Sequence, residues 1–194
     1  MRYANPGAYL ATFSGTDTSQ EGEIADDIDA VEHWIDRHCE RSFDVAASAT
    51  RVYIPQHTSA TLEVDDFTAI TSVKFDENAD GVFEVTVTGA EGWPLSAAYE
   101  SRPFTQLHLP SWASRTAFVA GVRVEATLLY GWDEIPQGVV RATVQLTGIL
   151  RMQSPRATAR FDEGIGSFIR SSPEANRIVR ELLDPYRMHP VAVA

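Results

Sequence analysis

The most suggestive polar cluster in the sequence lies at residues 76–81, which read Asp-Glu-Asn-Ala-Asp-Gly. Alternating Asp, Asn and Asp followed by Gly match the first half of a calcium loop, where side-chain oxygens converge and Gly permits a sharp turn. The twelfth position of such a loop needs an acid but is Val87 here, and Glu84 is the acid that could replace it in a non-standard loop. Because the flanks read as strands and acidic hairpin tips are common, we expect no bound metal here. The candidate ligands, should calcium bind, are Asp76, Asn78 and Asp80.

A second polar group consists of residues separated by four, three and four positions, which places them on one face of a helix. They are Asp29, His33, Asp36 and Glu40. Such a face can hold a metal when a second helix supplies matching ligands, usually Glu-x-x-His, and no such motif occurs elsewhere in the sequence. We therefore interpret this group as a solvated polar face.

Motifs for nucleophilic or phosphate chemistry are missing from the sequence. It has no Gly-x-Ser-x-Gly, no Gly-rich loop ending in Gly-Lys-Ser/Thr, and no His-Glu-x-x-His. His57, His108 and His189 belong to no paired motif, and the single Cys39 excludes an intramolecular disulfide and an all-Cys metal site. The sequence therefore predicts neither an enzyme nor a cofactor.

The charge of the chain limits the kinds of partner that it can bind. With 16 basic and 27 acidic residues, the formal net charge is −11 and the pI is near 4.8. This balance argues against a nucleic-acid grip, which needs a basic face, but it allows a protein that lines a passage for DNA. No apolar run approaches the ~18 residues of a membrane span, and the N-terminus lacks a signal-peptide core, so we expect an intracellular protein that does not bind membranes.

Helical periodicity predicts a first helix over about 20–41, after a flexible segment at 1–19 that is rich in Pro, Gly, Ser and Thr. Acidic residues at the start of this helix and basic residues at its end interact favourably with its dipole. Its expected buried stripe is Ile24, Ile28, Val31 and Ile35.

The middle of the sequence alternates apolar and polar residues, which is typical of half-buried strands. The Asp-Gly pair at 80–81 favours a hairpin between two of them. We expect strands at about 50–54, 60–64, up to 76, 83–88, 106–109 and 122–130. Together with the framing helices, these strands predict an α+β fold with a small antiparallel sheet.

Residues 122–152 join the last strand to a second long helix. The strand ends at the Tyr130-Gly131-Trp132 corner, and Pro136 suits the first turn of a helix, where its missing N–H has no cost. Apolar residues then recur at helical spacing up to Met152. The sequence therefore predicts a strand, a tight corner and a packing helix in succession.

The last forty residues differ in character. Residues 153–166 read as a linker, and Ser172-Pro173 begins a short amphipathic helix that is marginal when isolated in water. Its apolar face needs cover, either from the core of the chain or from a neighbouring subunit or partner. We expect three parts: a flexible segment at 1–19, an α+β core at 20–152, and a C-terminal arm at 153–194.

The order of these parts resembles the adaptor, or head-completion, proteins of long-tailed bacteriophages. The likeness covers about residues 20–152 and depends on the order and spacing of several short motifs. They are Cys39-Glu-Arg-Ser-Phe43 at the end of the first helix, Thr50-Arg-Val-Tyr53, Ile70-Thr-Ser-Val73 before the hairpin, and Tyr130-Gly-Trp132 with Ile135-Pro136, Val139 and Ala142. The C-terminal arm matches poorly.

This resemblance implies a structural virion protein of the head–tail connector, assembled in the host cytoplasm. Such adaptors form a dodecameric ring under the portal protein, dock on it through C-terminal segments, and present their other face to a stopper or tail-completion protein. Genomic DNA would pass through the lumen without specific binding, and an acidic lumen would let the phosphate backbone slide.

Under this interpretation, the C-terminal arm binds the portal or an adjacent subunit. The apolar candidates are Phe161, Phe168, Ile169, Ile178, Val179, Leu182, Leu183 and Tyr186. The basic candidates, which would face acidic neighbours, are Arg156, Arg160, Arg170, Arg177 and Arg180.

Two alternatives stay open. The first is a stopper or tail-completion (terminator) protein of the same connector, although such proteins are usually shorter and richer in β-structure. The second is an unrelated enzyme or a calcium-dependent binding module, which a metal requirement or a deep polar pocket would favour.

Overall fold

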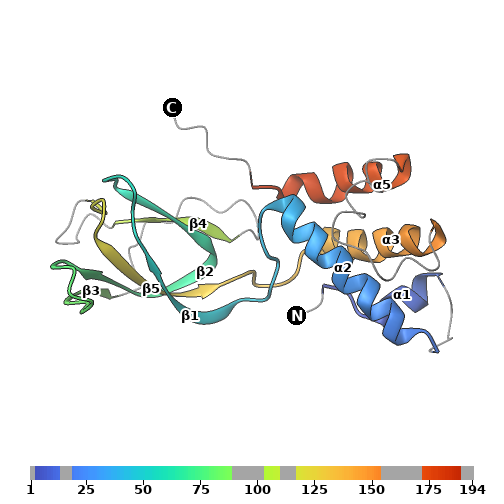
Figure 1. Ribbon diagram of the computed structural model, residues 1–194, viewed down its shortest axis with the longest axis horizontal. Helices are drawn as coiled ribbons and strands as arrows, with labels where there is room; N and C mark the ends of the chain where they lie inside the picture. The colour runs from blue at the N-terminus through green and yellow to red at the C-terminus, as the bar shows by residue number, and fades with distance from the viewer. Residues whose placement is uncertain (1–2, 14–18, 89–102, 110–116, 154–171, 189–194) are drawn as a thin grey trace. The chain divides into compact units, whose positions relative to one another are not determined.

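A computed structural model of the chain describes residues 3–13, 19–88, 103–109, 117–153 and 172–188 (Figure 1). The fold is α+β with a small antiparallel sheet, which confirms the predicted class. The chain divides into two compact units, and both of its ends belong to the same one. The helical unit contains residues 1–43 and 135–194, and the sheet unit contains residues 44–134.

The described residues of the sheet unit form five strands, all paired antiparallel: β1 (Ala47–Tyr53), β2 (Thr61–Asp76), β3 (Val85–Thr88), β4 (Phe104–His108) and β5 (Arg123–Tyr130). The order is β1-β5-β2-β3, and β4 pairs with the first part of β2. Sequence periodicity predicts separate strands at 60–64 and before 76, whereas β2 is continuous. Its register shifts near Phe67 and Ile70, and such bulges interrupt the alternation of side chains without ending the strand.

The predicted alternation in the last strand is confirmed by burial. Val124, Ala126 and Leu128 are fully buried, and the residues between them are more exposed. They pack with Phe67, Phe75 and Leu107 of the other strands and with Phe118, which precedes β5. The core of this unit is therefore built from one face of a strongly curved sheet.

The Tyr130-Gly131-Trp132 corner ties the end of β5 to other parts of the sheet unit. The Gly131 amide donates to the carbonyl oxygen of Asp66 at 2.8 Å, and the Trp132 amide donates to that of Asp44 at 2.9 Å. The Ala46 amide in turn donates to the carbonyl of Trp132 at 2.8 Å, and the Trp132 side chain is buried. Gly131 has a φ of 117°, in the region that favours glycine, so the corner depends on this residue.

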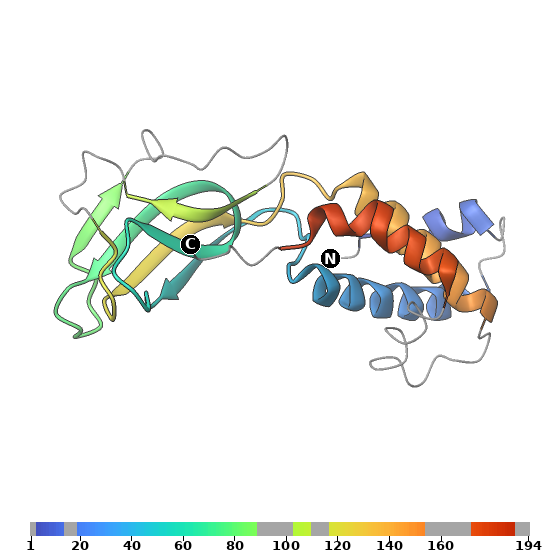
Figure 2. The same cartoon turned by 90° about the horizontal axis from the view of Figure 1, so that it is seen from above.

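The helical unit contains α1 (Pro6–Phe13), α2 (Glu21–Cys39), α3 (Gln137–Gln153) and a C-terminal segment made of α5 (Pro173–Ile178), η1 (Val179–Leu183) and η2 (Asp184–Tyr186). Figures 1 and 2 show α2, α3 and α5 side by side from two directions. The predicted stripe of α2 is buried, with Ile28 and Ile35 at 0% exposure. Arg151 of α3 donates to Asp27 of α2 at 2.5 Å and to Gln20 at 2.8 Å, which joins the two helices.

Helix α1 is not predicted by the sequence analysis, which treats residues 1–19 as a flexible segment. Pro6 and Gly7 read as loop residues, but Pro suits the first turn of a helix. The Asn5 side chain caps this turn by accepting from the Ala8 amide at 2.8 Å. Tyr9 and Leu10 are then buried with Ile24 and Ile28 of α2.

The segment before α1 is anchored on α2 by buried hydrogen bonds. The backbone amides of Tyr3 and Ala4 both donate to the Glu32 carboxylate. The Tyr3 hydroxyl donates to Asp36 at 2.5 Å and accepts from the Phe43 amide at 2.9 Å. Burial raises the pKa of Glu32 to about 7 although the two amides lower it, and the neighbouring charge of Asp29 adds to the increase.

We expect this raised pKa to make stability depend on pH. Between the ordinary value of 4.5 and about 7, the folded chain holds a proton that the unfolded chain releases. The free energy of unfolding contributed by Glu32 therefore falls as pH rises through this window. Glu32→Gln keeps an oxygen for both amides without a charge, so it should flatten this part of the profile and add about 1–3 kcal/mol above neutral pH.

The measurement is urea unfolding of the wild type and the variant across this pH range. Glu134→Gln, which changes an exposed acid, serves as the control and should leave the profile unchanged. Parallel profiles for the wild type and Glu32→Gln would contradict the assignment.

Candidate functional site

The acidic hairpin joins β2 to β3 and has a fixed backbone shape. Ala79 and Gly81 have positive φ angles of 61° and 89°. The Gly81 amide donates to Asp76 Oδ2 at 3.0 Å, the Asp80 amide to Asn78 Oδ1 at 3.1 Å, and the Val82 amide to Asp80 Oδ1 at 2.7 Å. The loop is therefore organised by its own side-chain oxygens, and this predicted hairpin tip is a structured turn.

This hairpin brings three carboxylates together. One oxygen from each of Asp76, Asp80 and Glu84 lies within 4.8 Å of the others. Asp76 is 1% exposed, whereas Asp80 and Glu84 are exposed. Arg123 of β5 forms an ion pair with this cluster, with its Nη1 at 3.9 Å from Asp76 Oδ2. Of the sequence candidates, Asp76 and Asp80 join this cluster, and Glu84 completes it.

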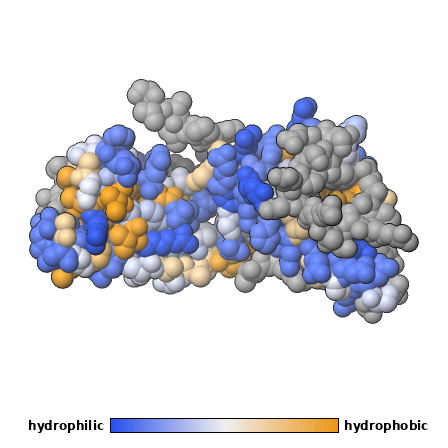
Figure 3. Space-filling model, viewed as in Figure 1, coloured by the Kyte–Doolittle hydropathy of each residue, from blue (hydrophilic) through white to orange (hydrophobic). Residues whose placement is uncertain are grey.

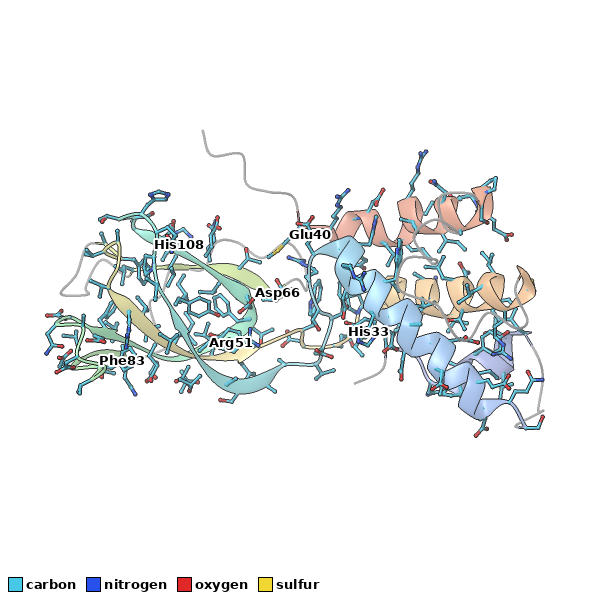
Figure 4. The ribbon with its side chains drawn as sticks, viewed as in Figure 1. His33, Glu40, Arg51, Asp66, Phe83 and His108 are labelled. Atoms are coloured by element: carbon cyan, nitrogen blue, oxygen red, sulfur yellow. The ribbon has the colours of Figure 1, made fainter. Side chains whose placement is uncertain are left out.

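The predicted polar face of α2 makes contacts within the helical unit instead. His33 Nδ1 lies 2.7 Å from the carbonyl oxygen of Asp29, one turn earlier, and Asp36 accepts from Tyr3. Figure 4 labels His33 within α2 and Glu40 at its end, where the chain turns with a φ of 56°. Within the described ranges, the hairpin is the one place where three metal-ligating side chains come close enough to share an ion.

A polar cluster that the sequence analysis does not identify lies between β1 and the first half of β2. Asp65 Oδ2 accepts from Arg51 Nη1 at 2.5 Å and from the Tyr53 hydroxyl at 2.9 Å. The Tyr53 hydroxyl lies 3.1 Å from that of Tyr130, and the guanidinium of Arg51 stands 4.2 Å above the Tyr130 ring. Burial raises the pKa of Tyr53 and of Tyr130. These side chains join two strands that share no backbone pairing among the described residues, and Figure 4 labels Arg51.

Strand β1 is also a candidate assembly surface. Its one partner among the described strands is β5, so no described strand pairs with its other edge. Such an edge can pair with a strand of another chain. Val52 and Ile54 on and after this strand are each 53% exposed. Figure 3 shows hydrophobic side chains among hydrophilic ones on the visible face of the sheet unit.

The C-terminal segment, predicted as an arm that binds partners, packs on the chain itself. Ser172 caps α5 as expected, because its hydroxyl accepts from the Ala175 amide at 3.3 Å. Ile178, Val179 and Leu183 are buried, and Leu182 and Tyr186 are half-buried.

Several contacts fasten this segment to α2 and to Phe43, which follows it. Asp184 lies 3.1 Å from His38 Nε2, and the Met188 amide donates to the carbonyl of Cys39 at 3.0 Å. The Tyr186 ring packs edge-on against Phe43. Burial raises the pKa of the Cys39 thiol to about 12, so this residue is an unreactive part of the same core.

These positions change which predicted residues can face a partner. The side chains of Ile178, Val179 and Leu183 are covered by their own unit, whereas Arg177 and Arg180 are exposed. Arg177 lies 3.6 Å from Glu181 in the next turn. The remaining candidates lie outside the described residues: Arg156, Arg160, Phe161, Phe168, Ile169 and Arg170.

None of the described helices combines the length and the hydropathy that crossing a membrane requires. No model of a protein family matches the sequence, and no protein with curated annotation matches it.

Two solved structures contain chains with a similar fold. A chain from the neck of an empty GTA particle, computed with C6 symmetry, matches with a TM-score of 0.55 and 14% identity, over 97% of this chain and 91% of that chain. A chain from the virion of a native gene transfer agent (GTA) particle matches with a TM-score of 0.52 and 14% identity, over the same shares. The fold of this protein is therefore similar, over nearly its whole length, to that of chains in GTA particles.

Proposed function

We propose that this protein is a structural subunit of the neck of a phage-like particle. The observation that carries the proposal is the likeness to a chain of a GTA neck, which covers 97% of this chain and 91% of the other. A likeness of this extent includes both the helical unit and the sheet unit. The order of elements that resembles phage adaptors in the sequence supports the same role independently.

Within the neck, we propose that the protein occupies the position of a head–tail connector adaptor. Copies of the chain would form a dodecameric ring between the portal protein and a stopper or tail-completion protein. The net charge of −11 suits a ring through which DNA passes, because like charges prevent the phosphate backbone from binding. The protein would act by assembly and would be part of the virion.

Two surfaces suit such contacts. The edge of β1 that no described strand pairs with lies beside the exposed Val52 and Ile54 and can pair with a neighbouring copy in the ring. The C-terminal segment offers the exposed Arg180 beside the half-buried Leu182 and Tyr186, and these would face the portal. A stopper or tail-completion protein of the same neck is the alternative place, because the neck likeness does not distinguish between neighbouring positions.

Deletion of the gene from the particle that encodes it tests this proposal. We expect heads and tails that assemble separately and do not join, and we expect the wild-type gene supplied in trans to restore joined particles. Tailed, infectious or gene-transferring particles formed without the protein would contradict the proposal. Heads that fail to assemble would also contradict it, because an adaptor acts after the head is built.

A further inference from the structure

The acidic hairpin contains a buried carboxylate oxygen without a hydrogen-bond partner. Asp76 is 1% exposed, and its Oδ2 accepts from the Gly81 amide, but its Oδ1 has no partner. A buried charged oxygen that is not paired costs free energy, because it loses water without replacing it. Arg123 is 3.9 Å from the other oxygen of this carboxylate, beyond hydrogen-bond distance.

Two further carboxylates lie close to one oxygen of Asp76. Those of Asp80 and Glu84 lie with Asp76 inside a span of 4.8 Å, so three acids crowd a single point. Three negative charges at such distances repel one another, and one of them is fully removed from water. A divalent cation bound between them would remove the repulsion. If Asp76 bound it through both oxygens, the ion would also satisfy the unpartnered Oδ1.

We propose that this hairpin binds one calcium ion through the carboxylates of Asp76, Asp80 and Glu84. The inference does not depend on the proposed function of the protein. Calcium suits the site because it accepts several carboxylate and carbonyl oxygens in a flexible arrangement, whereas magnesium needs a near-ideal octahedron and keeps most of its water.

The order of residues along the hairpin agrees with this ligand set. Counted from Asp76, the first, third, fifth and ninth positions of the loop are Asp76, Asn78, Asp80 and Glu84, which are the side-chain positions that calcium loops use. The sixth position is Gly81 with its φ of 89°, as such loops require. The twelfth position is the buried Val87, so the bidentate acid is missing and we expect a dissociation constant of about 10⁻⁴–10⁻³ M.

Arg123 opposes the bound ion. Its guanidinium is the cation beside Asp76, and it would repel calcium across a few ångströms. Arg123→Gln should therefore tighten calcium binding several-fold. An affinity that stays unchanged or weakens in this variant would contradict a site centred on Asp76.

Isothermal titration of the full chain with calcium chloride tests the site. We expect one saturable binding event, weakened by about tenfold or more in Asp80→Asn and in Glu84→Gln, since each removes a charged ligand. Both positions are exposed, so these variants should fold normally. Glu63→Gln is the control: it removes an exposed acid from β2, the strand that ends at Asp76, and should change the affinity less than twofold.

Amide chemical shifts measured by NMR locate the ion independently of the calorimetric titration. Addition of calcium should move the resonances of Gly81 and Val82 and leave those of β1 in place. The absence of saturable heat at millimolar calcium, equal affinities in all the variants, or shifts spread over the whole sheet would each overturn the proposal.

Discussion

Gly131→Ala should destabilise the sheet unit more than any other glycine substitution in the described part of the chain. An added Cβ would lie 2.5 Å from the carbonyl oxygen of Asp44 and 3.0 Å from Ala46, and both contacts are to backbone atoms that cannot rotate away. The φ of 117° adds strain for any residue with a side chain. We expect a loss of about 3 kcal/mol or more in the free energy of unfolding.

Gly121→Ala is the matched control for this change. Gly121 also has a positive φ, of 80°, but an added Cβ would meet nothing within 4 Å. Its cost should be the conformational strain alone, about 1 kcal/mol. Urea unfolding followed by tryptophan fluorescence measures both variants, since Trp132 is buried beside the first site. Equal losses in the two variants would show that the close approach to Asp44 does not matter.

Leu183→Ala should destabilise the helical unit by about 2–5 kcal/mol, as expected for a buried leucine that leaves a cavity. Leu183 is 0% exposed and lies in the segment that contacts Cys39, His38 and Phe43. The change tests whether the C-terminal segment is part of the fold of the isolated chain. Thermal unfolding monitored by far-ultraviolet circular dichroism measures the loss.

The neighbouring Leu182 provides a control of the same residue type. Its side chain is half-buried, so Leu182→Ala should cost clearly less stability than Leu183→Ala. If the segment is a detached arm in solution, the two substitutions will have equal and small effects. That result would support the sequence-based interpretation, in which the apolar residues of the segment are buried only when a partner binds.

Local patterns in the sequence predict much of this fold because they depend on neighbours along the chain. The stripe of α2, the alternation in β5, the Ser172 cap and the hairpin at 76–84 are each complete within a few turns or residues. The single strand β2 is predicted as separate pieces because its bulges shift the period of two. Helix α1 is missed because Pro and Gly suit both a loop and a first helical turn.

Contacts between distant residues could not be predicted in the same way. The cluster of Arg51, Asp65 and Tyr130 forms only when the curved sheet brings β1 near β2, and nothing local in either strand marks it. An amphipathic helix likewise shows that one face is covered but not by which surface. The burial of Leu183 against its own unit is decided by the fold of both chain ends together.

The carboxylate cluster falls between these cases. Asp76 and Asp80 are recognisable from their spacing, and Glu84 is the one acid near enough to replace the missing twelfth ligand. From the sequence alone, these acids are expected at an exposed hairpin tip, where water solvates them and no ion is needed. The burial of Asp76 changes this expectation, since a carboxylate without water needs a partner that the chain does not fully provide.

The place of the protein in an assembled particle tests the central proposal most directly. Electron cryomicroscopy of the particles that carry it can resolve the portal vertex with and without imposed symmetry. We predict a ring of copies between the portal and the tail, in which density fits both the helical unit and the sheet unit around a channel for DNA. Purified particles that lack the protein, or copies found in the capsid shell or along the tail, would contradict a role in the neck.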